Sequence, residues 1–155
     1  MPFEIQNRLT IDAPPEIVWE VITDLASYRE WNPFVPEASS TFEVGSPFEM
    51  KVQLFESFAQ PQRETVFEFE PGRRFRYGVA GGRFSPVRSS RTHRVEACDE
   101  GRTSYCSDFE IAGWLSPVVR LLTGRLLQRG FDSMAAGLQV RAEALHAVRR
   151  ELAKE

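Results

Sequence analysis

Cysteine and histidine are scarce in this sequence of 155 residues, with two of each. A turn signal at 99–101 places Cys98 beside a predicted hairpin turn, and Cys106 follows roughly 13 Å along the second strand at ~3.3 Å per residue. A disulfide requires Cα atoms within about 7 Å, so we expect two free thiols. His93 and His146 fall on different predicted elements without a cysteine or paired carboxylate at metal spacing, so no structural zinc is expected.

Long apolar runs are also missing. No uninterrupted stretch approaches the ~20 residues that span a bilayer, and the N-terminus lacks a basic region followed by an apolar run. We therefore expect no membrane insertion and, by default, a cytoplasmic protein. Glycine-rich phosphate loops, nucleophile elbows and metal motifs are absent as well, so phosphoryl transfer, serine hydrolysis, metal catalysis and a bound cofactor are not expected.

The residues that are present have an ordinary balance: 42% are hydrophobic, 26% are charged, and the formal net charge is -3. This balance excludes a disordered composition and a general polyanion binder. A chain of 17.7 kDa fits one domain over residues 1–155, which would bury roughly 70% of its unfolded surface.

Charge is uneven along the chain. Residues 1–70 carry thirteen Asp/Glu against four Lys/Arg, and residues 71–155 carry nine against fifteen. Eight arginines lie on or beside predicted strands: Arg73, Arg74, Arg76, Arg83, Arg88, Arg91, Arg94 and Arg102. They are either an RNA- or protein-binding stripe or the solvent face of antiparallel strands opposite acidic strands. Their alternation and the lack of RNA-type aromatic motifs favour the second interpretation, and no DNA partner is expected.

Hydrophobic periodicity predicts the order of the elements. Alternation indicates a strand over 3–11, a proline pair then begins a helix over 15–23, and a second short helix carries Tyr28 and Trp31 until Pro33 ends it. Six more strands are predicted at about 37–44, 48–54, 65–70, 75–79, 86–98 and 102–112. Short connections, one of them expected at Gln60-Pro61, imply an antiparallel meander.

The C-terminal part carries two leucine stripes displaced by about 100° on a helical projection. A break near Thr123-Gly124 reconciles them, which predicts a short helix over 115–122 and a long helix over 125–152. Gly130 and Gly137 share one side of the long helix. They serve close approach to the sheet or leave room for something else.

This order resembles the START-like, or Bet v 1-like, helix-grip fold. The segment IDAPPEIVWEVITDLASYREWNPFV is similar to the N-terminal signature of the polyketide cyclase/dehydrase and lipid-transport (SRPBCC-type) superfamily, and the matching positions are Val18-Trp19, Asp24, Tyr28, Trp31 and Pro33. The resemblance implies an α+β fold: a seven-stranded antiparallel curved sheet wrapped around a long C-terminal helix, with two short helices between the first two strands. It does not specify a function.

In such a fold a cavity lies between the sheet and the long helix. The side chains expected to face it are Phe48, Met50, Phe67, Phe69, Phe75, Tyr77, Arg91, His93, Tyr105, Ser107, Phe109, Met134 and Leu138. A solid core would need the same apolar residues. We favour an open cavity, because a sheet wrapped on a helix with two glycines is hard to fill.

Polar residues on the inward register would decide what binds. His93 could bond a ligand oxygen or move a proton, or it could be a buried histidine satisfied by Tyr105, Ser107 or the backbone. Arg91 could neutralise a ligand carboxylate or could reach out at the end of the sheet. Tyr28 and Trp31 are expected to close the core near Leu145, Val148 and Leu152 rather than to contact a ligand.

Three hypotheses for function follow. The first is a binder or carrier of a hydrophobic small molecule of lipid, polyketide or aromatic type. The second is a cyclase- or dehydratase-type enzyme with His93 as general acid/base and Tyr105 or Arg91 holding an enolate. The third is a protein- or RNA-interaction module. The sequence favours the first, and it leaves the ligand and the oligomeric state open.

Overall fold

The computed structural model describes residues 2–155. The elements follow one another as β1 (Phe3–Ile11), α1 (Pro15–Thr23), the 3-10 turn η1 (Leu25–Ser27), α2 (Tyr28–Trp31), β2 (Glu37–Ser40), β3 (Pro47–Phe55), β4 (Phe58–Glu70), β5 (Arg74–Gly78), β6 (Arg88–Ala97), β7 (Thr103–Ala112) and α3 (Ser116–Ala153). The seven strands form one antiparallel sheet in the order β1-β7-β6-β5-β4-β3-β2. The predicted α+β helix-grip fold is confirmed.

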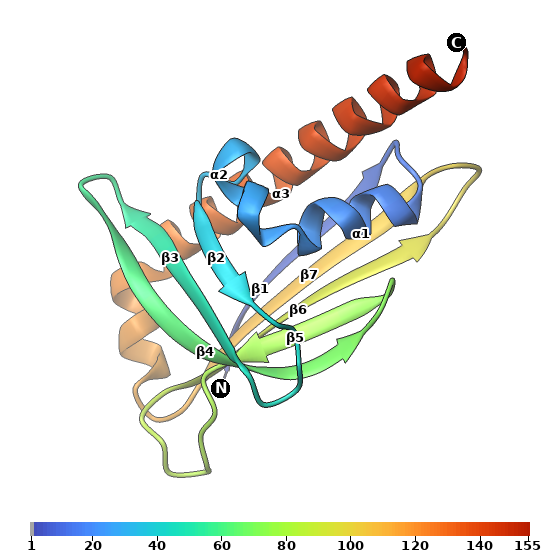
Figure 1. Ribbon diagram of the computed structural model, residues 1–155. Helices are drawn as coiled ribbons and strands as arrows, with labels where there is room; N and C mark the ends of the chain where they lie inside the picture. Colours follow the sequence, from blue (N-terminus) through green and yellow to red (C-terminus); the bar gives the residue numbers. More distant parts are fainter. Residues whose placement is uncertain (1) are drawn as a thin grey trace.

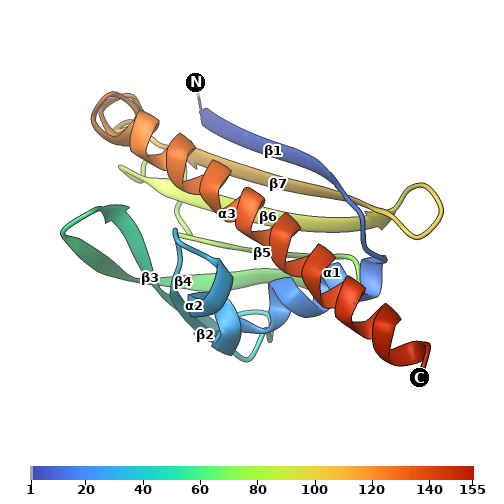
Figure 2. The same ribbon diagram turned by 90° about the horizontal axis from the view of Figure 1, so that it is seen from above.

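The sheet curves around α3 on one face (Figure 1). Seen from above, α3 crosses the sheet obliquely, with β1 and β7 on one side and β2 to β4 on the other (Figure 2). Helix α1 lies against the C-terminal half of α3 in both views, and the two helices are in contact. Helix α1 therefore does not cover the N-terminal half of α3, which faces the sheet (Figure 1 and Figure 2).

The turn predicted at Gln60-Pro61 is wrong. β3 and β4 are joined at 56–57, and Pro61 lies inside β4 opposite Lys51. Pairing between β4 and β5 begins only at Thr65, so β4 has a neighbour on one side where Pro61 stands. Proline is tolerated in a strand that lacks a second neighbour, because its missing N–H is not needed there.

The predicted break at Thr123-Gly124 is also wrong, because α3 is continuous over Ser116–Ala153. The Thr123 hydroxyl donates to the Val119 carbonyl at 2.7 Å, inside an unbroken helix. The two leucine stripes do not both mark buried faces, since Leu122 is 72% exposed. The conflict in periodicity came from an exposed leucine and not from a change in the helix.

Gly130 and Gly137 of α3 pack against the segment after α1 and not against the sheet. A Cβ on Gly130 would collide with the Phe34 ring, and a Cβ on Gly137 would collide with the Trp31 carbonyl oxygen. Trp31 therefore lies opposite the middle of α3. The contacts predicted for Tyr28 and Trp31 with the end of the helix are wrong for Val148 and Leu152, which are more than half exposed.

The sequence predictions on the cysteines and on the register of β6 agree with the structure. Cys98 and Cys106 are free thiols. The predicted inward face of β6 is confirmed, because Arg91, His93 and Val95 are all buried.

Candidate functional site

A cavity of about 380 Å³ lies between the sheet and the N-terminal half of α3. Its walls are formed by Phe34, Val35, Met50, Val52, Leu54, Gln62, Arg63, Glu64, Tyr77, Val79, Val87, Ser89, Arg91, Phe109, Ile111, Val119, Thr123, Leu127 and Phe131. The volume is within the range of small-molecule sites, and most of the lining is apolar. The helix-grip is therefore hollow at this end.

The loop between α2 and β2 closes one wall. The buried Asn32 side-chain oxygen accepts the backbone N–H groups of Phe34 and Val35 at 3.2 and 2.9 Å. The Phe34 carbonyl in turn accepts the Gln53 N–H at 2.7 Å. These bonds fix the Phe34 ring against Gly130 and edge-on to Phe131, at 4.9 Å between ring centroids.

The opposite end of the grip is solid. His93, Phe75, Tyr105, Met134 and Leu138 are all almost fully buried there and do not line the cavity. Both sequence interpretations thus hold, each for one half of the fold: a packed core under α1 and an open cavity under the first turns of α3.

Arg91 is the one cation of β6 that enters the cavity, and it is 4% exposed. Its Nε and Nη2 atoms donate to the Ser107 hydroxyl at 3.3 and 3.2 Å, and its guanidinium lies 4.3 Å from the Phe131 ring centroid. Within residues 2–155 it forms no ion pair. The alternative that Arg91 reaches out at the end of the sheet is wrong.

Glu64 enters the same cavity from β4. Burial raises the pKa of its carboxyl, and the Arg91 charge offsets only part of this rise. The resulting pKa is about 7, compared with 4.5 for a free carboxyl of this type. The two side chains do not form an ion pair within the described chain. A carboxyl group near half-ionisation at neutral pH thus shares an apolar cavity with a buried cation.

The free energy of unfolding should depend on pH because the pKa of Glu64 is raised in the folded protein. Because the folded-state pKa is above the unfolded value, folding becomes less favourable as pH rises from 4.5 to about 7. We expect Glu64→Gln to exceed the wild type in unfolding free energy by on the order of 3 kcal/mol at pH 8, and to match it within about 0.5 kcal/mol at pH 4.5. Urea titrations at the two pH values measure this, and an equal difference at both would contradict it.

His93 does not reach the cavity. It is fully buried, its Nδ1 lies 2.7 Å from the Tyr105 hydroxyl oxygen, and its ring is stacked on Phe75 at 4.7 Å between centroids. Its Nε2 has no partner among residues 2–155. Burial and then the Arg91 charge hold the pKa of His93 well below its usual range, so the ring is neutral. The structure supports the structural role for His93.

Of the thirteen predicted site residues, four line the cavity: Met50, Tyr77, Arg91 and Phe109. Seven others are buried beside or behind it without lining it: Phe48, Phe75, His93, Tyr105, Ser107, Met134 and Leu138. Phe69 is half-buried and packs on Trp19 and Phe42 at the solid end.

Phe67 is on the outer face of the sheet, so its predicted inward orientation is wrong. The Arg76 guanidinium lies 5.4 Å from the Phe67 ring centroid. A β-bulge between Val66 and Glu68 shifts the register, so that Val66 and Phe69 face inward and Phe67 does not. The same shift explains why Glu64 was missed as a cavity residue.

The predicted cavity residues of α3, Met134 and Leu138, are not the ones that line it. Val119, Thr123, Leu127 and Phe131 line the cavity at a spacing of four residues, so they lie on one helical face. This spacing was visible in the sequence, but the exposed leucines of the same turns obscured it.

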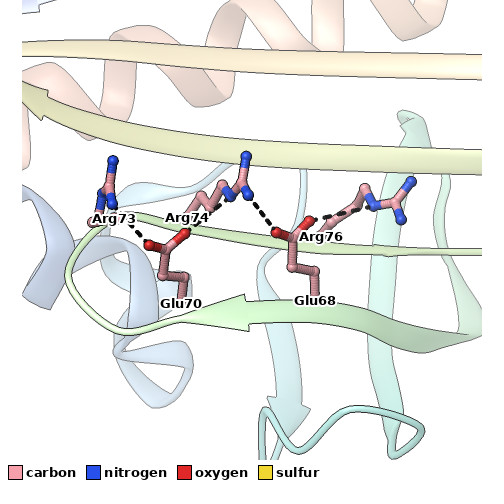
Figure 3. Close-up of polar contacts among 5 residues, drawn as sticks. All are labelled: Glu68, Glu70, Arg73, Arg74 and Arg76. Carbon is pink, nitrogen blue, oxygen red and sulfur yellow. Dashed lines mark hydrogen bonds and ion pairs between the residues drawn. The ribbon is translucent and has the colours of Figure 1, made fainter.

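The arginines in and beside β5 and β6 mostly have carboxylate partners. Arg73, Arg74 and Arg76 form ion pairs with Glu68 and Glu70 of β4 (Figure 3). Two further pairs, Arg94–Asp108 and Arg102–Asp99, follow the same pattern. This arrangement supports the interpretation as a solvated sheet face.

Residues 2–155 contain neither a side-chain cluster suited to a metal ion nor a helix suited to cross a membrane. No group of three or more His, Cys, Asp or Glu side chains there is placed to hold a metal ion. None of the helices in this range is long and apolar enough to cross a membrane.

Comparison with known proteins gives one family and many related structures. The family model for polyketide cyclase/dehydrase and lipid transport proteins matches residues 2–143. No curated protein shows a reliable match to the chain.

Three solved structures illustrate the similarity. The Zhui aromatase/cyclase from Streptomyces sp. R1128 has 17% identity and a TM-score of 0.73, with 92% of this chain and 94% of that chain covered. A START superfamily protein from Mycobacterium smegmatis has 15% identity and a TM-score of 0.70, covering 92% and 98%. Norcoclaurine synthase from Thalictrum flavum, in complex with dopamine and hydroxybenzaldehyde, has 15% identity and a TM-score of 0.65, covering 90% and 85%. At such identities these structures establish the shared fold alone.

Proposed function

The chain belongs to the polyketide cyclase/dehydrase and lipid transport family, and from this premise we propose that residues 1–155 form one domain that binds or carries a hydrophobic small molecule. The single observation that carries the proposal is the cavity of about 380 Å³ under the N-terminal half of α3. The proposed compartment is the cytoplasm, where unpaired cysteines such as Cys98 and Cys106 stay reduced.

The lining supports an apolar ligand with one polar end. The cavity offers apolar contacts from β3, β7 and α3, through Met50, Val52, Leu54, Ile111 and Leu127. The polar groups Glu64 and Arg91 project into the same space. A few polar groups in an apolar cavity are typical of sites that orient a small molecule by one end.

Binding of a neutral apolar probe tests the proposal. We expect N-phenyl-1-naphthylamine to bind the purified protein saturably, with one molecule per chain, because the probe needs an enclosed apolar space and no ionic partner. Fluorescence titration measures this. Absence of saturable binding by the folded protein would overturn the proposed function.

A second candidate is proton-transfer chemistry of the cyclase or dehydratase type. The observation in its favour is Glu64, because a carboxyl with a pKa of about 7 is suited to act as general acid or base at neutral pH. His93 is no longer the candidate, since it is neutral and outside the cavity. Hydrogen–deuterium exchange at the α-carbon of a bound β-ketoacid, present in the wild type and lost in Glu64→Gln, would identify such an activity.

The interaction-module hypothesis receives less support. The outer-face arginines Arg74 and Arg76 of β5 already have carboxylate partners, and these compete with an external polyanion. Salt-sensitive retention on immobilised RNA would be required to revive it.

A further inference from the structure

The buried Arg91 side chain lines the cavity and has no carboxylate partner among residues 2–155. Arg91 carries five N–H donors, and two of its nitrogen atoms share one acceptor, the Ser107 hydroxyl. The Arg91 guanidinium carbon lies 4.3 Å from the centroid of the Phe131 ring, which makes a cation–π contact. The ring carries no negative charge and so does not neutralise the guanidinium. A buried cation without a carboxylate is costly for the fold, because the charge has lost its hydration.

Outer-face arginines of β5 and β6 show the contrast. Arg74 and Arg94 lie on the outer face, where water screens them, and each still has a carboxylate within 3.0 Å. Arg91 is more deeply buried than either and has none in the described chain. Its charge is directed into the cavity instead.

Glu64 does not neutralise Arg91, although both line the cavity. Burial favours the protonated form of this carboxyl, which then has a hydroxyl to donate. An anionic oxygen placed between the two side chains could accept from the guanidinium on one side and from the Glu64 hydroxyl on the other.

From this arrangement we infer that the ligand is an amphipathic organic acid, whose carboxylate or equally acidic oxygen binds Arg91 and protonated Glu64 while its apolar part fills the space under α3. This inference rests on the proposed function, because it specifies the chemical class of the same ligand. It assigns Arg91 the role of charge partner and Glu64 the role of hydrogen-bond donor.

The arrangement links binding to pH. Charged or titratable groups that face Glu64 are Arg91 from β6, Tyr77 from β5 and Arg63 on β4 itself; the cavity residues of β3, β7 and α3 do not titrate. Burial raises the pKa of Tyr77 well above its usual range, so Tyr77 stays neutral. A ligand carboxylate would oppose ionisation of Glu64, so binding above pH 7 requires proton uptake. Affinity for the acid should fall as pH rises from about 7 to about 9.

The test is displacement of N-phenyl-1-naphthylamine by matched pairs: decanoic acid against 1-decanol, and 2-naphthoic acid against 2-naphthalenemethanol. In the wild type at pH 6.5 we expect the acid of at least one pair to displace the probe at about a tenfold lower concentration than its alcohol. The preference should shrink at pH 8.5. This comparison needs no variant and is independent of any folding defect.

Substitutions show which residues cause the preference for the acid over the alcohol. Arg91→Gln should reduce the acid-to-alcohol ratio to within about threefold, and Glu64→Gln should keep the preference but lose its pH dependence. Arg94→Gln, which removes an outer-face arginine of the same strand, should leave the ratio unchanged.

Each outcome decides the inference. Equal displacement by acids and alcohols in the wild type, or a preference that survives Arg91→Gln, would overturn it while the proposed apolar binding still stands. If the neutral probe itself does not bind, the proposed function fails, and the inference fails with it.

Discussion

A protein with both Val119→Trp and Leu127→Trp is expected to lose affinity for N-phenyl-1-naphthylamine by about tenfold or more. Both side chains face the cavity from one side of α3, and both are half-buried, so larger rings can enter the cavity without displacing the packed core. The helix should stay intact, because tryptophan is tolerated in helices at small cost. Fluorescence titration of wild type and variant measures the change.

The matched control is Val118→Trp with Leu121→Trp. These residues lie in the first two turns of α3 but are 46% and 84% exposed and do not line the cavity. Added rings there change surface hydrophobicity without filling the cavity. Equal loss of binding in both double variants would show that the probe binds the outside of the helix.

Gly137→Ala is expected to lower the free energy of unfolding by about 2 kcal/mol or more. The added methyl would collide with the Trp31 carbonyl, which is backbone and cannot rotate away. The clash outweighs the gain in helix propensity of about 1 kcal/mol. Urea unfolding followed by circular dichroism measures the change.

Gly124→Ala on the same helix serves as the control. A Cβ there would make an ordinary contact at 3.6 Å with the Phe3 ring, so the helix propensity should dominate and stability should rise by up to about 1 kcal/mol. If both substitutions stabilise the protein, the close approach of α2 to α3 at Gly137 is not as described.

The strands and their order were predictable because each carries a clear alternation of apolar and polar residues. The inward faces of β6 and β7 followed from that alternation, and Arg91 was placed correctly among the cavity candidates. Short connections explain the pairing of consecutive strands from β2 to β7, whereas the pairing of β1 with β7 joins strands far apart in the sequence.

The cavity was only partly predictable, and the reasons are local. A β-bulge at Val66–Glu68 reverses the faces on its two sides, so an unbroken alternation assigned Phe67 inward and Glu64 outward. The residue types at that point do not indicate a β-bulge. Glu64, the group with the most unusual chemistry in the cavity, was missed for this reason.

The helix was misjudged for a different reason. Sequence periodicity treats every leucine as buried, whereas Leu121 and Leu122 are exposed and the cavity face is marked by the smaller Val119 and Thr123. Whether a helix-grip fold has a packed core or a cavity depends on the distance between its long helix and its sheet. That distance is set by contacts such as Trp31 on Gly137, which join segments far apart in the sequence.

The central claim is that a small apolar molecule binds inside the cavity, and methyl NMR tests it most directly. The protein, ¹³C-labelled at its Ile, Leu and Val methyl groups, would be titrated with N-phenyl-1-naphthylamine. The account predicts that the largest shift changes fall on Val52, Ile111 and Leu127, which line the cavity. Changes concentrated on the exposed Leu121 and Leu122 instead would contradict it.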